Sequence, residues 1–149
     1  QAMVKIKAFG LNRMDIMQRK GQYPLPPGVT STLGVEFSGV IEETGDEASE
    51  YKKGDEVFGL AYGGAYAEYI VLDSGMLTRK PSELSFVQAA AIPEAWLTAF
   101  QALFLIAGMK EGDRVLIHAG ASGVGIAANQ LAKGFGAKEV FTTAGSKEK

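Results

Sequence analysis

Apolar and polar residues alternate over the first stretch of the chain, Met3-Val4-Lys5-Ile6-Lys7-Ala8. Alternation of this kind is typical of a strand with one exposed face. The pattern predicts another strand over Val35–Ile41, and two short strands within residues 55–75, on either side of Gly63-Gly64. Several short strands at this spacing indicate a small β-barrel or sandwich.

Helical signals follow in the middle of the chain. Asn12 is a suitable N-cap for a short helix that Gly21 ends, and Ser85 is a suitable N-cap for the segment FVQAAAI. Pro93 separates that segment from a predicted helix over about 95–107. This helix carries an apolar stripe that we expect to face the core: Trp96, Phe100, Leu103 and Ala107.

The last part of the chain reads as strand, small-residue turn, helix and strand. The apolar run Val115-Leu116-Ile117 leads into a turn over residues 119–125, and a β-branched run, Val140 to Thr143, follows the helix. Backbone N–H groups at a helix start lack intrahelical acceptors and carry partial positive charge, so an anion binds there. The unit therefore predicts binding of a dinucleotide's pyrophosphate.

The turn departs from the usual G-x-G-x-x-G pattern at one position. It reads Gly120-Ala121-Ser122-Gly123-Val124-Gly125, so Ser122 stands where the middle glycine is expected. Serine is the next smallest choice, and its hydroxyl can donate to a phosphate oxygen. The motif alone is weak, and the strands and helix around it carry the interpretation.

The end of the second strand bears on which dinucleotide binds. NAD sites usually carry an acid there that bonds the ribose 2′-hydroxyl, but this chain has Ala144-Gly145 at that point, followed by Ser146-Lys147-Glu148-Lys149. Missing negative charge and added positive charge favour a 2′-phosphate, and hence NADP(H). A solvated C-terminal charge cluster is the alternative explanation.

Composition narrows the possible functions. The length of 149 residues, with 46% hydrophobic and 21% charged residues, fits a globular protein, and the net charge of −2 gives no case for nucleic acid or membrane binding. No cysteine is present and His118 is the only histidine, so we predict no disulfide and no metal site. We expect His118 to be a packed residue at a strand end. No secretory or transit signal is visible, and we expect a cytoplasmic protein.

Four motifs in chain order, LNRMDIMQRKGQYPLPPG, LGVEFSGVI, AAAIPEAWLTAFQAL and LIHAGASGVGIAANQLAK, resemble the zeta-crystallin-like quinone oxidoreductases. These form part of the zinc-independent branch of the medium-chain dehydrogenase/reductase superfamily. The serine in the turn and the AGS-x-x-K segment look most similar to the tumour-suppressor-inducible quinone oxidoreductase subgroup. Members of the family are longer, so the resemblance implies an N-terminal and central fragment of an enzyme.

The resemblance implies an α/β fold class in two parts. A partial GroES-like β-barrel catalytic domain is expected over residues 1–87, and the first β-α-β of a Rossmann NADP-binding domain over residues 88–149. It also implies NADPH-dependent reduction of quinones or related conjugated carbonyls without a metal, by an enzyme that is a homodimer at full length. Zinc-dependent relatives carry Gly-His-Glu where this chain has Gly34-Val35-Glu36, and a cysteine in the loop that here reads Gly10-Leu11-Asn12.

Candidate site residues follow from the turn and from the resemblance. The cofactor-binding candidates belong to the phosphate turn, to the positions expected at the 2′-phosphate, or to the domain junction near the cofactor. They are Gly120, Ser122, Gly123 and Val124 in the turn, Gly145, Ser146 and Lys149 at the 2′-phosphate, and Thr98 at the junction. The candidates near the substrate are Asn12, Asp15 and Tyr23, and Asn12 or Tyr23 is expected to hydrogen-bond a developing oxyanion. Each also has a plain structural explanation, as an N-cap, a helix-start charge and a loop aromatic. A non-catalytic binding or structural chain and an enoyl-thioester reductase are the alternative functions.

Overall fold

The computed structural model describes residues 1–46, 48 and 50–146. The chain divides into two compact units, Gln1–Glu94 and Ala95–Lys149. Where the functional domains meet, expected between residues 87 and 88, stays a prediction.

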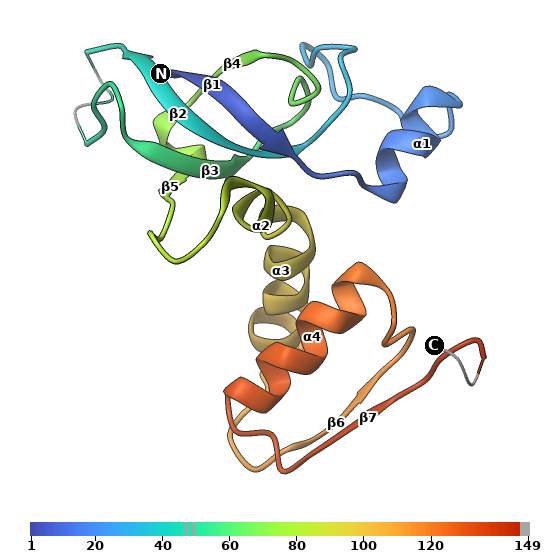
Figure 1. Ribbon diagram of the computed structural model, residues 1–149. Helices are drawn as coiled ribbons and strands as arrows, with labels where there is room; N and C mark the ends of the chain where they lie inside the picture. Colours follow the sequence, from blue (N-terminus) through green and yellow to red (C-terminus); the bar gives the residue numbers. More distant parts are fainter. Residues whose placement is uncertain (47, 49, 147–149) are drawn as a thin grey trace. The chain divides into compact units, whose positions relative to one another are not determined.

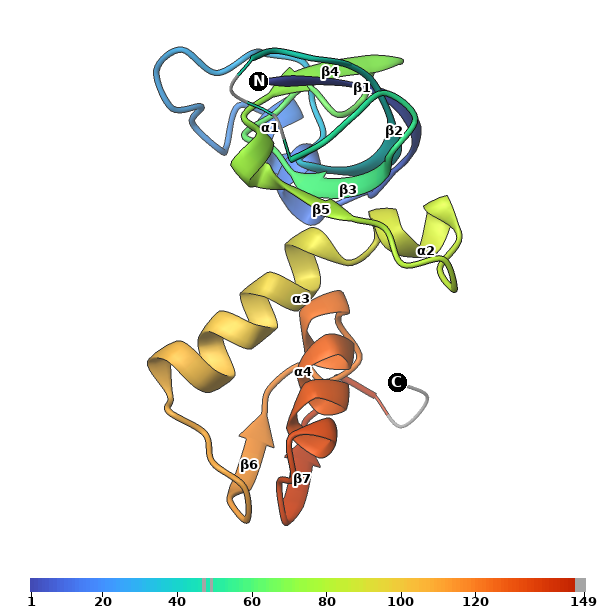
Figure 2. The same ribbon diagram turned by 90° about the vertical axis from the view of Figure 1, so that its left-hand side faces the viewer.

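An antiparallel sheet forms the first unit. Within the described residues its strand order is β4-β1-β2-β3-β5, and Figure 2 shows the strands curving around a common interior. The strands are β1 (Ala2–Phe9), β2 (Glu36–Thr44), β3 (Glu56–Leu60), β4 (Tyr69–Leu72) and β5 (Leu77–Arg79). The alternation that predicted β1 buries Ala2 and Val4, because successive side chains of a strand point to opposite faces.

The core of this unit gathers apolar side chains from all five strands. Phe37, Ile41, Val4 and Val57 are its largest fully buried side chains. The two strands on either side of Gly63-Gly64 do not pair with each other, since β4 pairs with β1 and β3 pairs with β2 and β5. The short strand β5 and the 3-10 turn η1 (Ser74–Met76) before it have no clear signal in the sequence pattern.

Two short helices complete the first unit. Helix α1 (Arg13–Arg19) follows β1 directly, with Asn12 as its N-cap residue and Gly21 in the left-handed conformation after its end. Helix α2 (Phe86–Ala90) starts at Ser85, whose hydroxyl accepts a hydrogen bond from the Gln88 N–H, as predicted. The Ser38 hydroxyl donates to the Phe86 carbonyl at 2.5 Å, which fixes the start of α2 against β2.

The second unit contains the predicted β-α-β arrangement. Strands β6 and β7 are parallel neighbours, and helix α4 lies between them in the sequence and against them in space (Figure 1). The elements in chain order are α3 (Pro93–Phe100), η2 (Gln101–Ile106), β6 (Arg114–Ile117), α4 (Gly123–Gly134) and β7 (Glu139–Thr142). Val115 and Ile117 face the core with α4, while Leu116 and Phe141 are exposed on the other face of the strands.

The predicted helix over 95–107 changes its geometry midway. Segment η2 is a π-helical continuation of α3, and the Ala107 N–H bonds the Ala102 carbonyl five residues earlier. Each π-helical residue turns less about the axis, so positions after the segment, such as Ala107, leave the predicted stripe; the exposure of Phe100, which lies in the α-helical part, has no such cause. Leu103 is buried and Trp96 is half-buried, as expected, but Phe100 and Ala107 are exposed and Ala99 is buried instead.

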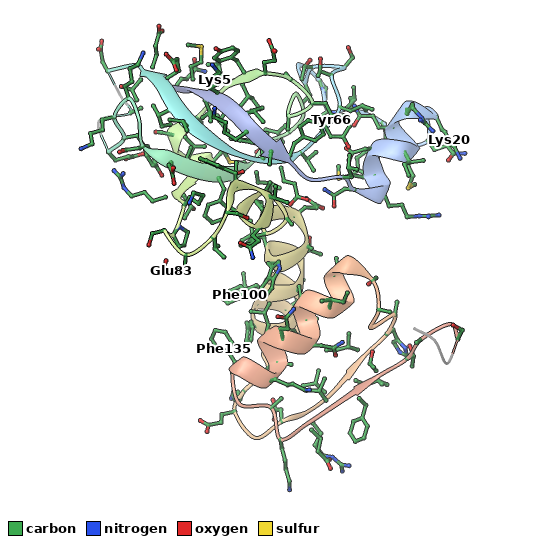
Figure 3. The ribbon with its side chains drawn as sticks, in the orientation of Figure 1. Lys5, Lys20, Tyr66, Glu83, Phe100 and Phe135 are labelled. Carbon is green, nitrogen blue, oxygen red and sulfur yellow. The ribbon has the colours of Figure 1, made fainter. Side chains whose placement is uncertain are left out.

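The exposed Phe100 still has aromatic neighbours. Its ring centroid lies 4.8 Å from that of Phe104, which lies 4.7 Å from that of Phe135. Figure 3 labels Phe100 and Phe135 on this cluster.

No helix in the described part of the chain is long and apolar enough to cross a membrane.

Candidate functional site

A hydrogen-bonded group of side chains surrounds the start of α1. The Asn12 Nδ2 donates to Oε1 of Glu36 at 2.8 Å, and the backbone N–H of Glu94 donates to Oε2 of the same carboxylate at 2.8 Å. Glu36 is only 4% exposed, at the first position of β2. Both oxygens of this buried carboxylate therefore have donors, and the amide of Asn12 is held in one orientation.

Asp15 lies in the first turn of α1, and one of its carboxylate oxygens has two donors. Oδ2 accepts from the Asn12 backbone N–H at 2.8 Å and from the Tyr66 hydroxyl at 2.9 Å. Asp15 is 4% exposed, and its Oδ1 is buried without a partner among the described residues. Tyr66, labelled in Figure 3, comes from the loop between β3 and β4 and lies on the α1 side of the sheet.

Two neighbouring groups fix the ring of Tyr66. Its centroid lies 4.6 Å from that of Phe9. The second group is Gly34, which has a φ of 91°, and a side chain at this position would overlap the Tyr66 ring. Gly34 thus supplies both a left-handed backbone and the space that the tyrosine fills.

Burial and nearby carboxylates change the acidity of two groups here. Burial, together with the hydrogen bond to Asp15, raises the pKa of Tyr66 to about 12. Burial, and then the negative charges of Glu36 and Asp15, raise the pKa of Glu94 above its ordinary value. Tyr66 therefore remains a hydrogen-bond donor at every physiological pH.

A hollow of about 440 Å³ opens beside α1. It is lined by Leu11, Asn12, Arg13, Asp15, Ile16, Arg19, Leu33 and Tyr66. Of the three residues predicted near the substrate, Asn12 and Asp15 thus lie together. Tyr23 is 41% exposed in the loop after α1 and does not line this hollow.

The start of α4 forms the second candidate site. Ser122 is the N-cap, and its Oγ accepts from the Gly125 N–H at 3.0 Å, while its backbone N–H bonds the Ala119 carbonyl. The N–H groups of Gly123 and Val124 have no backbone acceptor within the described residues. These are the unpaired donors that attract an anion to a helix N-terminus.

The outer glycines of the turn allow close packing between helix and strands. A Cβ on Gly125 would overlap the Ala119 carbonyl oxygen and lie 2.7 Å from the Gly120 Cα. A Cβ on Gly120 would overlap the side chain of Thr142 on β7. Gly120 is buried, and its expected contribution to binding is to keep the turn tight.

A hollow of about 280 Å³ lies beside this turn, lined by Ala119, Ala121, Ser122, Ala144 and Gly145. The predicted Ser122 and Gly145 are thus brought together, although they are far apart in the sequence. Ser146 is exposed and follows Gly145 directly, whereas Thr98 is exposed on α3 and does not line the hollow. Lys149 lies outside the described residues.

His118 is not the packed residue that we expected. It is exposed, and its Nδ1 lies 3.2 Å from the Thr143 hydroxyl. The same hydroxyl accepts from the Ala119 N–H at 3.2 Å. Ala119 has a φ of 54°, which is unusual for a residue with a side chain. This positive φ bends the chain directly after His118.

Sequence reasoning missed Glu36, Tyr66 and Glu94 as members of the first site. A signal existed for Glu36, because a carboxylate between Val35 and Phe37 in an apolar strand must find donors if it is buried. Tyr66 lies 51 residues along the chain from Asp15, to which it donates, and Glu94 lies 58 residues from Glu36. No local pattern marks such partners.

The sequence pattern of the alcohol dehydrogenase GroES-like domain matches residues 1–82, and the chain belongs to this family. Within it, the chain is similar to quinone oxidoreductases: it is 40% identical to the quinone oxidoreductase of Homo sapiens over 149 residues. These matches confirm the resemblance drawn from the motifs and the expected α/β fold class. The narrower likeness to the tumour-suppressor-inducible subgroup stays a prediction.

Two solved structures have the same fold over this length. The Escherichia coli quinone oxidoreductase, solved in complex with NADPH, is 35% identical with a TM-score of 0.88, and the CurK enoyl reductase is 36% identical with a TM-score of 0.89. The alignments cover 99% of this chain, and 45% and 46% of those two chains. The match to the human protein likewise covers 99% of this chain and 45% of that protein. The chain therefore spans about half the length of these relatives.

Proposed function

We propose that the chain is the cofactor-phosphate and substrate-cleft part of an enzyme that reduces quinones or related conjugated carbonyls with NADPH and without a metal. The observation that carries this proposal is the start of α4. There, two N–H groups without acceptors among the described residues and the cap residue Ser122 adjoin a hollow that Ala144 and Gly145 line where an NAD site would carry an acid. The similarity to an oxidoreductase solved with NADPH supports it. A cytoplasmic location and a homodimer of the full-length enzyme belong to the same proposal.

In this proposal the residues of the turn bind the cofactor's phosphates. Gly123 and Val124 offer backbone N–H groups to the pyrophosphate, and the Ser122 hydroxyl can still donate while its oxygen caps α4. Gly145 leaves open space, since none of the described residues beyond its chain neighbours lies within 4 Å of a Cβ built there. Ser146 and Lys149 are the groups proposed to meet the 2′-phosphate. When bound, NADPH supplies the hydride, and the protein binds and orients it.

The side chains near α1 are proposed to contact the substrate. The Asn12 amide has a second N–H beyond the one given to Glu36, and that N–H is proposed to donate to the substrate oxygen as negative charge develops. A donor held in place by Glu36 needs little reorganisation during the reaction. The occupied oxygens of Glu36, together with Val35 in place of a histidine, support a mechanism without zinc.

Cofactor binding tests the proposal directly. NADPH and NADH are titrated into the chain and into Gly145→Asp, which places an acid at the open position where NAD sites carry one. The wild-type chain should prefer NADPH, and Gly145→Asp should weaken NADPH by about tenfold or more while sparing NADH. Lys149→Ala should weaken NADPH more than NADH. Lys138→Ala removes one surface charge elsewhere and should change neither.

Equal loss of both cofactors in Gly145→Asp and Lys149→Ala would contradict the 2′-phosphate assignment. Turnover with a quinone then tests the reaction. The second candidate is an enoyl-thioester reductase, which the similarity to the CurK enoyl reductase favours. A panel that contains a quinone, an enone and an enoyl thioester separates the two, and binding of NADPH without any turnover would favour a non-catalytic chain.

A further inference from the structure

We propose that Thr143 is a positioning residue for cofactor binding, because its hydroxyl holds the turn at the start of α4 in the form that meets the phosphates. The proposal rests on the proposed function for the nature of the ligand. It goes further in assigning the shape of the turn to one side chain that lies outside it, directly after β7.

Thr143 contacts the end of β6 and the beginning of the turn through its backbone and its side chain. Its N–H donates to the Ile117 carbonyl at 3.1 Å, and its carbonyl accepts from the Gly120 N–H at 2.9 Å. Its Oγ1 accepts from the Ala119 N–H, between these two, at 3.2 Å. The paired residues of β6 and β7 end at Ile117 and Thr142, so these bonds continue the connection into the turn.

The hydroxyl of Thr143 can accept and donate at the same time. While Oγ1 accepts from Ala119, its own proton can be given to Nδ1 of His118, which lies 3.2 Å away. Among the described residues, the Ala119 N–H has no other acceptor. A valine has the same shape and can do neither, so the hydroxyl can be tested separately from the shape of the side chain.

Ala119 needs such a contact because its backbone is unusual. Its φ of 54° lies in the left-handed region, which is unfavourable for a residue with a Cβ. A conformation of this kind persists only where the surrounding structure holds it. Without the bond to Thr143, Ala119 would be freer to return to an ordinary backbone conformation.

The conformation of Ala119 decides where its carbonyl points, and that carbonyl organises the rest of the turn. It accepts from the Ser122 N–H at 2.9 Å, and Ser122 in turn caps α4 by accepting from the Gly125 N–H. The N–H groups of Gly123 and Val124, which come next, are the donors proposed for the pyrophosphate. A change at Ala119 therefore reaches the groups that would meet the cofactor.

Thr143 also connects two segments that line the hollow at this turn. Ala119 lines it before α4, and Ala144 and Gly145, which follow Thr143 directly, line it after β7. The bond between Thr143 and Ala119 therefore helps to set the distance between these segments. Because the pyrophosphate is common to NADPH and NADH, loss of this bond should weaken both.

Titration of NADPH and of NADH into the full chain and its variants tests the proposal. Thr143→Val should weaken both nucleotides by about fivefold or more, as expected for the loss of a hydrogen bond. Thr143→Ser keeps the hydroxyl and should bind both within about twofold of the wild type. Thr78→Val makes the same change at an exposed threonine of β5 and should alter neither affinity. Wild-type affinity in Thr143→Val, or equal losses in the valine and serine variants, would overturn the proposal.

NMR of the isotope-labelled chain without cofactor shows whether the hydroxyl acts through Ala119. A positive φ brings the amide and α protons of a residue close together, so Ala119 should give a strong NOE between them in the wild type and in Thr143→Ser. In Thr143→Val this NOE should weaken, and the Ser122 N–H should exchange faster with solvent. Weaker nucleotide binding with an unchanged NOE would overturn the assignment.

The two measurements separate this proposal from the proposed function. A wild-type chain that binds neither nucleotide contradicts the proposed function, whatever the NMR of Ala119 shows. A wild-type chain that prefers NADPH, and whose affinities are the same in Thr143→Val, contradicts the role of Thr143 alone. Thr143→Val should also keep the preference for NADPH, because it weakens both nucleotides by a similar factor, whereas Gly145→Asp should change that preference.

Discussion

The hollow beside α1 is lined by side chains that hydrogen-bond one another, whereas the hollow at the start of α4 is lined by three alanines, a serine and a glycine. In the first, Asn12, Asp15 and Tyr66 are held by partners far away in the sequence. In the second, the useful donors are backbone N–H groups that small residues leave uncovered. The first site depends on side chains that hydrogen-bond one another. The second depends on small residues that leave backbone N–H groups accessible, so different substitutions should disrupt the two sites.

The largest effect is expected where a side chain is added to the turn. Gly125→Ala forces a Cβ against the Ala119 carbonyl and should lower the free energy of unfolding of the second unit by about 3 kcal/mol. Gly134→Ala, in the same helix with nothing within 4 Å, should raise it by roughly 0.5 kcal/mol. Trp96 is the single tryptophan and packs against the core of this unit, so its fluorescence in denaturant reports the change. Similar small effects of both variants would contradict the close packing of the turn.

A smaller effect is expected where a buried partner is altered in the first site. Glu36→Gln replaces one acceptor oxygen by an NH₂ group, which then faces either the Asn12 amide or the Glu94 N–H as a second donor. One buried donor loses its acceptor, so unfolding of the first unit should become easier by about 2 kcal/mol. Glu42→Gln, in an exposed ion pair with Lys53, should leave the free energy of unfolding nearly unchanged. Hydrogen exchange of the β1 and β2 amides measures both, and equal stabilities would mean that the Glu36 contacts contribute nothing.

The smallest effect is expected for Tyr66→Phe, which removes one of two donors to Asp15 Oδ2 and should cost about 1 kcal/mol at pH 7. Its pH dependence is more informative. The pKa of Tyr66 is raised from 10.0 to about 12 in the folded chain, so the unfolded chain loses this proton first as the pH rises. The free energy of unfolding should therefore fall between about pH 10 and 12 in the wild type, and fall less steeply in Tyr66→Phe.

Tyr62→Phe, at a tyrosine that is 74% exposed, is the matched control and should keep the wild-type slope. Denaturant titrations at a series of alkaline pH values, followed by circular dichroism, provide the measurement. The same slope in Tyr66→Phe as in the wild type would show that the hydroxyl is not held as the structure describes.

The same contrast explains what the sequence could predict. The turn between β6 and α4 depends on a run of small residues, a serine cap and two flanking strands, all within one continuous segment, so its geometry followed from the pattern. The cleft beside α1 depends on Tyr66 and on the backbone of Glu94, which no local pattern links to Asp15 or Glu36. The π-helical segment after α3 was missed for another reason, since its residues are ordinary helix formers and only the register of packing reveals it.

The contacts of Glu36 also have a consequence for the order in which the chain folds. Its two donors come from residues 24 and 58 positions away, and closing such loops costs entropy before the contacts form. The serine cap at the start of α4 is made by residues three positions apart, although the preceding Ala119 and Gly120 also bond Thr143. During folding, the start of α4 can therefore form early by local contacts, while the cleft around Asp15 must wait until the antiparallel sheet has assembled.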